Sequence, residues 1–349
     1  MSLAFARQRE QIDAYDFRAI HDHLRFGTAS DRYAGWIGQI YPESYAGRLS
    51  SRPRQLDGQR FTERTLPVES VADYFQHFEV LELDFTFYRP LRDPDGSPSN
   101  NYFVLQQYAE HAPDSAGFFL KAPQLYAART IRGQQGGAAT YTANAHFLDA
   151  GDFQRRFLEP AVEILGNRLL GILFEQEYQR VSESPSPEEN IADLDGFFSK
   201  LPSDVQVHLE LRSAHLLSES YFAWLASRGL GFVFSHWTWL PPIREQWRLC
   251  GGQFTARDGQ IVTRLLTPLG MPYAKAYAQA HPFDKPLPTI TDSEAGKAMV
   301  LDVTALAYQA FGSNRLLNVI VNNRAWGNAP ALAQAIAHRV IDEEARRSG

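Results

Sequence analysis

Apolar residues along the chain gather in short runs of strand length, and longer helical patterns lie between most of these runs. The predicted strands span residues 24–30, 79–88, 117–123, 169–177, 206–213, 231–237, 260–266 and 316–323. The predicted helices span residues 68–78, 100–112, 152–166, 187–201, 218–229, 241–249, 293–312 and 329–347. Strands that alternate with helices in this way are typical of a parallel barrel, so we predict an α/β fold with a TIM-like (β/α)8 barrel.

The chain has 349 residues, which is longer than a typical barrel of roughly 250 residues. We attribute the excess in part to a helical N-terminal extension over residues 1–23, ahead of a single barrel domain over residues 24–349. Long loop insertions are predicted at residues 44–67 and 270–292. The run GQQGG at residues 133–137 does not match a dinucleotide-binding fingerprint, and we interpret it as a mobile loop.

The second predicted strand alternates large apolar residues with polar ones. Its polar positions Glu82, Asp84, Thr86 and Tyr88 share one face, because successive side chains of a strand point to opposite sides. We expect this face to point toward the barrel axis. Charges in that position need partners, because an unpaired buried charge is costly.

The fifth predicted strand repeats the pattern. His208, Glu210 and Arg212 share one face, while Val207 and Leu209 share the other. We expect the apolar face to pack against the surrounding helices, so that the polar face points into the barrel. An ion network that only holds the barrel together would explain the same pattern, although most barrels fill their interior with branched apolar side chains.

The carboxyl ends of the strands form the active-site end of such a barrel, so we place the candidate chemistry there. We predict Glu210 as the proton carrier, with Glu82 as its partner and Lys121 as a third catalytic residue. Arg212 and Arg264 offer forked guanidinium groups for an anionic group of the substrate. The remaining substrate-binding candidates are Asn322, Asn323, Tyr88, Trp36 and Thr86.

The composition narrows the choice of partners. A formal net charge of −6 argues against bulk binding to nucleic acid or to an anionic membrane surface. No stretch approaches the roughly 18 apolar residues of a membrane span, and the first residues lack the apolar core of a signal peptide. Cys250 is the single cysteine, so neither an intramolecular disulfide nor a cysteine-based metal site is expected. We therefore expect a cytoplasmic protein that binds a small, anionic molecule.

The sequence contains no HExxH, CxxC, P-loop or GxSxG motif. Acids and histidines at the strand ends could hold a divalent metal, but Lys121, Arg212 and Arg264 would repel a cation there, so we predict neither a metal nor a cofactor. A retaining glycosidase needs two carboxyl groups about 5–5.5 Å apart. Glu210 with Glu82 could form that pair, which leaves sugar hydrolysis as a weaker alternative.

Several motifs in order resemble the YecE-like family, also called domain of unknown function 72. The motifs are RFGTAS, then Trp36 and Tyr41-Pro42, then VLELDFTFYRP, FFLKAP, HLELRS and NVIVNNRAWGNAP. Their order and spacing match the family from about residue 24 to about residue 345. The resemblance implies a TIM-like barrel. It singles out Trp36, Glu82, Thr86, Tyr88, Lys121, Glu210, Arg212, Arg264, Asn322 and Asn323.

Three runs depart from the family's pattern. Thr130-Ile131 stands where the family usually has Thr-His, FEQEY at residues 174–178 replaces Q-L-P-P, and RLLTPLG at residues 264–270 replaces R-L-H-G. Two family histidines are thus missing, so an altered or inactive site is an alternative interpretation. The activity of the family is not established, so the resemblance implies a fold and a site rather than a reaction.

Three interpretations compete. The first is a small-molecule enzyme, such as a metal-independent hydrolase, lyase or isomerase, that uses acid/base chemistry on an anionic or polyhydroxylated substrate at the barrel mouth. The second is a non-catalytic binding or scaffold protein whose interior charges pair with one another. The third is a metal-dependent hydrolase or nuclease-like barrel, for which Arg48, Arg52, Arg54 and Arg60 would supply a basic rim.

Overall fold

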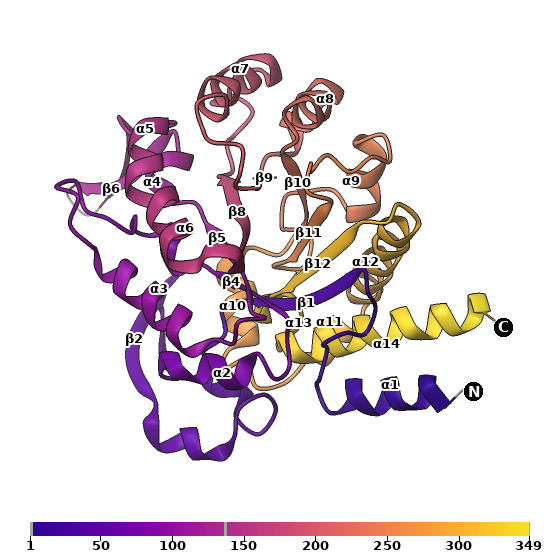
Figure 1. Cartoon of the computed structure of the whole chain (residues 1–349). Helices are drawn as coiled ribbons and strands as arrows, with labels where there is room; N and C mark the ends of the chain where they lie inside the picture. The colour runs from indigo at the N-terminus through magenta and orange to yellow at the C-terminus, as the bar shows by residue number, and fades with distance from the viewer. Residues whose placement is uncertain (1–2, 136–137, 349) are drawn as a thin grey trace.

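The computed structural model describes residues 3–135 and 138–348. Over these residues, eight parallel strands close into a barrel in the order β1-β12-β11-β10-β9-β8-β5-β4 (Figure 1). The barrel strands are β1 (Leu24–Ala29), β4 (Val80–Leu83), β5 (Gly117–Lys121), β8 (Leu169–Gln176), β9 (Val207–Leu211), β10 (Gly231–His236), β11 (Gln260–Leu265) and β12 (Leu316–Val321). The predicted TIM-like (β/α)8 fold is confirmed, and each predicted strand overlaps one barrel strand.

Helices between the strands form the outer layer (Figure 1). They are α2 (Val71–Tyr74), α3 (Asn100–His111), α4 (Gln124–Ala127), α5 (Ala150–Phe153), α6 (Glu159–Leu165), α7 (Pro187–Phe198), α8 (Glu219–Arg228), α9 (Ile243–Leu249), α10 (Tyr273–Ala280), α11 (Pro288–Thr291), α12 (Glu294–Gly312), α13 (Asn323–Trp326) and α14 (Ala329–Ser348). Local signals fix their ends. Ser186 and Glu189 form a capping box at the start of α7, and Gly229 ends α8 with a φ of 64°, which glycine adopts at low cost.

The second barrel strand is shorter than predicted. β4 ends at Leu83, and residues 85–87 form a 3-10 helix, so the predicted continuation of the strand to Tyr88 is wrong. The hydroxyl of Thr86 donates to the backbone oxygens of Leu83 at 3.1 Å and Lys121 at 2.7 Å, which stabilises this turn. The chain therefore leaves the sheet after four residues, and the polar row does not continue along one strand.

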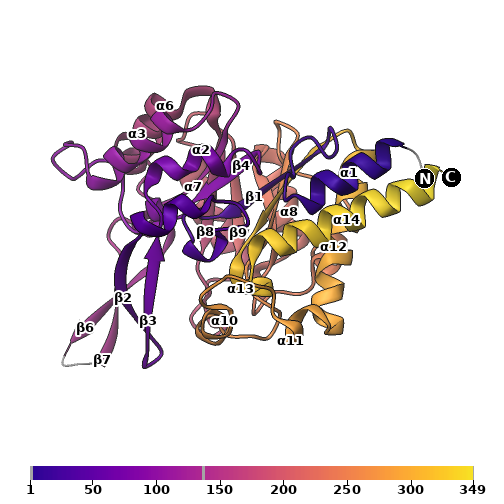
Figure 2. The same cartoon turned by 90° about the horizontal axis from the view of Figure 1, so that it is seen from below.

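Two segments that we predicted as loops contain antiparallel hairpins. The paired strands are β2 (Ser50–Leu56) with β3 (Gln59–Thr65), and β6 (Thr130–Gln135) with β7 (Ala138–Ala143). Residues 136–137 of the glycine-rich run lie outside the described residues. Figure 2 shows both hairpins extending away from the barrel. Phe61 of β3 packs edge-on against Tyr277 of α10 (Tyr273–Ala280), with ring centroids 5.1 Å apart, so the first hairpin is held against a helix. The prediction of a loop over residues 270–292 is wrong in part, because α10 and α11 (Pro288–Thr291) lie within this segment.

Part of the barrel interior is apolar. We call its seven buried members the inner apolar cluster: Ala29, Val80, Phe119, Leu173, Val233, Val262 and Ile320. His208 is fully buried and meets Phe119 edge-on, with ring centroids 5.8 Å apart. A Cβ at Gly231 would overlap the His208 ring, and a Cβ at Gly171 would come within 3.2 Å of it. Glycine at these two positions makes room for the imidazole.

The two ends of the chain lie side by side, because α1 (Leu3–Asp13) runs along α14 (Figure 2). Arg9 forms an ion pair with Asp342 at 2.5 Å, and His338 Nε2 lies 2.8 Å from Asp13 Oδ1. Within the described parts of the chain, no helix combines the length and the apolar character needed to cross a membrane.

Candidate functional site

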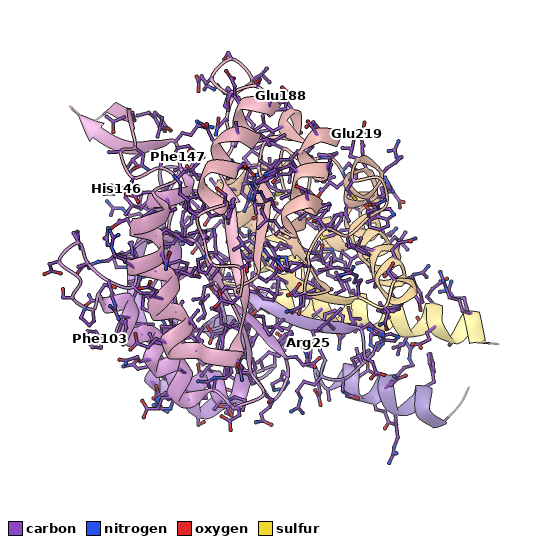
Figure 3. The ribbon with its side chains drawn as sticks, turned by 45° about the horizontal axis from the view of Figure 1, so that its top comes forward. Arg25, Phe103, His146, Phe147, Glu188 and Glu219 are labelled. Atoms are coloured by element: carbon purple, nitrogen blue, oxygen red, sulfur yellow. The ribbon has the colours of Figure 1, made fainter. Side chains whose placement is uncertain are left out.

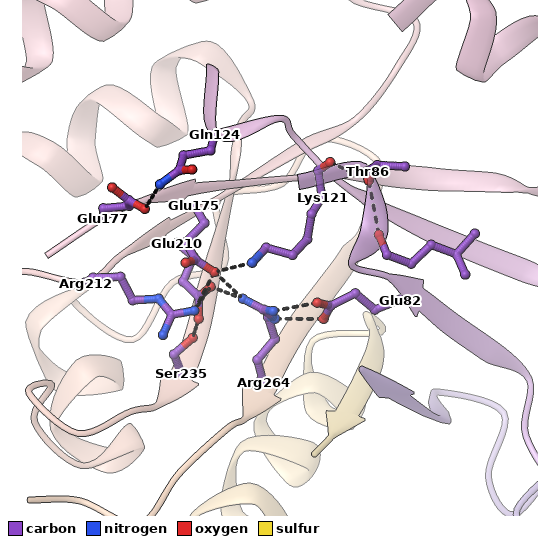
Figure 4. A network of polar contacts seen from close by, with 11 residues as sticks. Glu82, Thr86, Lys121, Gln124, Glu175, Glu177, Glu210, Arg212, Ser235 and Arg264 are labelled. Carbon is purple, nitrogen blue, oxygen red and sulfur yellow. Dashed lines mark hydrogen bonds and ion pairs between the residues drawn. The ribbon is translucent and has the colours of Figure 1, made fainter. Parts of the chain in front are cut away.

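Six charged side chains meet at the carboxyl ends of the barrel strands (Figure 4). We call this group the ion cluster, and its members are Glu82, Lys121, Glu175, Glu210, Arg212 and Arg264. Three acids and three bases give the cluster a formal charge of zero. Several members follow a residue of the inner apolar cluster by two positions, so one face of the strand is first apolar and then charged.

Arg264 on β11 is the centre of the ion cluster. Its Nε and Nη2 donate to the two carboxylate oxygens of Glu82 on β4, at 2.8 Å and 2.5 Å. Its Nη1 donates to Glu210 and lies 3.3 Å from Glu175. Strands β4 and β11 are not neighbours, so these side chains meet across the barrel. The forked geometry is among the stronger kinds of protein hydrogen bond.

Glu175 joins all three cations of the cluster through one oxygen. Its Oε2 lies 2.9 Å from Lys121 Nζ, 2.5 Å from Arg212 Nη2 and 3.3 Å from Arg264 Nη1. The side chains of Glu175 and Lys121 are 12% and 11% exposed, whereas that of Glu210 has no exposure. The pair of Glu175 and Lys121 therefore forms the least buried edge of the cluster, although both side chains are largely buried.

Glu210 is fully engaged within the protein. Its Oε1 accepts a hydrogen bond from the Ser235 hydroxyl. Its Oε2 accepts from Arg212 Nη2 at 3.0 Å and from Arg264. Arg212 in turn stacks on the ring of Trp237, with its Cζ 4.1 Å from the ring centroid. The guanidinium is thus fixed by acids and by an aromatic face.

Two acids at the end of β8 differ in their pKa. Burial opposes the ionisation of Glu175, but the three cations of the cluster outweigh it and hold its pKa well below the usual value. Burial raises the pKa of Glu177, and the negative charge of Glu175 adds to the effect. Gln124 Nε2 donates to Glu177 Oε1 at 2.6 Å. The pKa values of these neighbouring acids are therefore shifted in opposite directions.

Burial also shifts the deeper groups. It raises the pKa of Glu82, although Arg264 opposes this. Burial also opposes the charge of Arg264, but the surrounding carboxylates outweigh it and raise its pKa. Because the hydrogen bonds between Glu82 and Arg264 have the lengths of a charged pair, we treat both as ionised. Burial lowers the pKa of both His208 and His236 to about 4, so both rings are neutral at pH 7.

The structure brings together five of the residues predicted from sequence, namely Glu82, Lys121, Glu210, Arg212 and Arg264. The other five lie outside the ion cluster. Trp36 is fully buried, and its indole N–H donates to Asn323 Oδ1 at 3.0 Å. The side chain of Asn322 accepts from the Arg324 backbone N–H and caps α13. Tyr88 is 76% exposed beyond β4. Thr86, described above, bonds to backbone oxygens, so substrate contact by these five stays a prediction.

The sequence places Glu175 and Ser235 at strand ends and offers Glu175 as a possible metal ligand, but neither residue was among the predicted catalytic or substrate-binding residues. Both contact the ion cluster, as described above. A signal was present, because Glu175 follows Leu173 by two positions and Ser235 follows Val233 in the same way. An acid or hydroxyl on the inward face at the carboxyl end of a strand is the feature to look for.

Nowhere in residues 3–135 and 138–348 do three His, Cys, Asp or Glu side chains gather so that they could hold a metal. His236, a candidate ligand by sequence, places its Nδ1 2.8 Å from the backbone oxygen of Thr267. Each carboxylate of the ion cluster contacts Arg264.

The fold and this site define a TIM-like barrel protein with an ion cluster at the carboxyl ends of its strands. The chain belongs to the family described as "Protein of unknown function DUF72", which matches residues 25–348. The resemblance to the YecE-like family is thereby confirmed, because the two names denote one family. No curated protein matches the chain.

Solved structures of the same family share the fold. A DUF72 family protein from Thermotoga maritima is 17% identical, with 91% of this chain and 99% of that chain covered and a TM-score of 0.53. Two structures of a DUF72 family protein from Enterococcus faecalis are 14% and 12% identical over 91% and 92% of this chain. They are covered over 95% and 98% of their own length, and both have a TM-score of 0.52. At this identity the likeness shows the fold alone.

Proposed function

We propose that this protein binds a small anionic or hydroxylated molecule at the carboxyl end of the barrel and exchanges protons with it. The least buried edge of the ion cluster carries this proposal. There, Oε2 of Glu175 is bound by Lys121, Arg212 and Arg264, which together form a set of donors suited to a carboxylate. A ligand that carries its own carboxylate would reach this edge and meet Lys121 and Arg212.

The cost of buried charge supports a ligand role. Burying ion pairs removes them from water, and their mutual attraction often only offsets that cost, so apolar residues of similar size are commonly as stable. The same strands carry apolar residues in the inner apolar cluster, two positions earlier. A layer of charged side chains at the end of the barrel where active sites form is better explained by ligand binding than by packing of the core.

The opposite pKa shifts of Glu175 and Glu177 support proton exchange. An ionised acid beside a more readily protonated one is the arrangement that separates a base from an acid. Glu210 was the expected proton carrier, yet both its oxygens are engaged. We therefore assign proton exchange to Glu177, whose pKa is raised, while Glu175 holds the three cations in place. Glu82 and Glu210 would instead hold Arg264 in the orientation that receives the ligand.

A non-catalytic scaffold is the second candidate function. One observation favours it: every charge of the ion cluster already has a partner of opposite sign within the cluster. A barrel that kept these ions for its own structure would have this arrangement. Such a protein would be indifferent to small anions.

Thermal unfolding against a ligand panel tests the proposal. The panel contains small carboxylic acids, hexuronates, sugar phosphates and neutral polyols. A ligand present at about 100 times its Kd stabilises the native state by roughly 2.7 kcal/mol. For a chain of 349 residues this corresponds to a midpoint rise of about 4 °C. We expect at least one acid to produce this rise and neutral polyols to produce less.

A pair of lysine variants provides the control. Lys121→Gln removes the least buried cation of the ion cluster and should abolish the ligand-induced rise. Lys297→Gln removes a lysine on α12 that is 55% exposed and pairs only with Glu294 in its own helix, so it should keep the full rise. An equal rise in the Lys121→Gln variant, or no rise with any acid in the wild type, would overturn the proposal and favour the scaffold.

A further inference from the structure

Exposed aromatic side chains gather on the loops that follow the barrel strands. Tyr178 follows β8 and Trp239 follows β10, and each is 51% exposed. Their ring centroids are 6.0 Å apart, and the rings are tilted by 41°. Exposed aromatic area of this kind commonly marks a binding surface, because large rings otherwise gain from burial.

Arg212 connects this aromatic pair to the ion cluster. Trp237, two residues before Trp239, lies over the Arg212 guanidinium, as described above. Arg212 itself is only 5% exposed, and it is bound to Glu175 and Glu210. The aromatic surface and the ion cluster are therefore parts of one continuous region at the carboxyl end of β8, β9 and β10.

Polar atoms on the same three loops lack hydrogen-bond partners. Among the described residues, the buried donors Arg212 Nε and Trp237 Nε1 are unpartnered, and so are the buried atoms Gln179 Oε1 and His215 Nε2. Leaving such a group unsatisfied costs about 1–3 kcal/mol. Hydroxyl groups both donate and accept, so a polyhydroxylated ligand could satisfy donors and acceptors alike.

The charge balance of the ion cluster limits the charge of the ligand. The ion cluster has equal numbers of acids and bases. It therefore has no unpaired cation that could neutralise the charge of a ligand. A monoanion is tolerated in such a site far better than a polyphosphate. The sequence also lacks the glycine-rich phosphate loop that would bind a polyphosphate through backbone N–H groups.

We infer that the loops after β8, β9 and β10 form a subsite for a sugar acid. Its hydroxylated ring would pack against Tyr178 and Trp239, and its carboxylate would face Arg212 and Lys121. The unpartnered atoms of Gln179 and the neighbouring loops are buried in the free protein, and they would bind the hydroxyl groups once a shift of these loops uncovers them. This inference rests on the proposed function, and it adds the chemical class of the ligand and the residues that select it.

Calorimetric titration with matched probes tests the inference. The probes are glucuronate, galacturonate and mannuronate, with lactate as a carboxylate without a ring and glucose as a ring without a carboxylate. We expect at least one hexuronate to bind about tenfold more tightly than lactate or glucose, because a stacked ring adds to the ion contacts. Trp239→Ala should weaken hexuronate binding about tenfold and leave lactate binding unchanged.

Phe103→Ala is the matched control. Phe103 is 52% exposed on α3 and lies at the outer edge of the molecule in Figure 3, so its loss should change neither affinity. If lactate binds but Trp239→Ala leaves hexuronate affinity unchanged, the sugar-acid subsite is wrong while the proposed function stands. If neither lactate nor any hexuronate binds the wild-type protein, both are wrong.

Discussion

The inner apolar cluster and the ion cluster share strands β4, β5, β8 and β11 yet differ completely in chemistry. On each of these strands an apolar residue precedes a charged one by two positions: Val80 and Glu82, Phe119 and Lys121, Leu173 and Glu175, and Val262 and Arg264. Local structure is the same for both members of each pair. The difference therefore depends on position along the barrel axis. The apolar side chains lie deeper inside the barrel, and the charged side chains lie at the carboxyl end, where barrel proteins bind their ligands.

The two clusters should respond differently to mutation. The apolar layer is stabilised by burial and is sensitive to shape, because its side chains are close-packed. The charged layer is sensitive to the loss of a partner, because a single unpaired charge is far more costly than a missing pair.

The largest effect is expected for Arg264→Met. This change removes the main partner of Glu82 and one partner of Glu210, both of which have no side-chain exposure. Leaving buried carboxylates without their cation should lower the free energy of unfolding by about 3–5 kcal/mol, as measured by chemical denaturation. Adding Glu82→Gln should recover part of the loss. A loss below about 1 kcal/mol in the single variant would contradict the central role of Arg264.

Acid pH should destabilise the barrel through two buried histidines that lie outside the ion cluster. His208 and His236 have a pKa of about 4 in the folded chain, against about 6.5 when unfolded. Between these values the unfolded chain binds more protons, so the stability present above pH 6.5 falls as the pH drops toward 4. The loss amounts to about 3 kcal/mol for each histidine. Denaturation curves at pH 7, 6 and 5 should show this slope, and His208→Asn should flatten it.

A smaller effect is expected for Gly231→Ala. The added methyl group would overlap the His208 ring, and overpacking of this kind costs about 1–3 kcal/mol. Gly196→Ala on α7 is the control, because a Cβ there meets no other atom and a helix interior favours alanine. If denaturation gave the two variants equal stability, the space that Gly231 leaves for the His208 ring would not matter for the stability of the protein.

The smallest effect is expected for an exposed ion pair. Arg89 and Asp93 lie 2.7 Å apart, but their side chains are 50% and 26% exposed. Arg89→Ala should change the free energy of unfolding by less than about 1 kcal/mol, because water screens such pairs. A loss as large as that of Arg264→Met would remove the distinction between buried and exposed charges on which the comparison depends.

The fold was largely predictable because buried parallel strands appear in the sequence as apolar runs. The error at the second strand has a physical cause. Phe85 and Phe87 continue the alternation of a strand, but the hydroxyl of Thr86 bonds to the backbone of β4 and β5 and bends the chain. Periodicity along one segment does not reveal a bond to another strand.

The first hairpin was missed for a different reason. Most positions of β2 and β3 are exposed, and their sequences SSRPRQL and QRFTERT lack apolar alternation. The members of the ion cluster were mostly predictable from their place at strand ends. Their pairing was not, because Arg264 reaches Glu82 across the barrel and Glu175 joins cations from three different strands or loops.

Calorimetric titration in two buffers of different ionisation enthalpy tests the central claim most directly. It measures both ligand binding and the protons exchanged on binding. With the acid that most stabilises the protein, we predict one saturable site and net proton uptake, because a bound anion raises the pKa of Glu177 further. Glu177→Gln should bind with less proton uptake. Saturable binding without proton exchange would contradict the acid/base role, and no saturable binding of any acid would show that the ion cluster serves only the structure of the barrel.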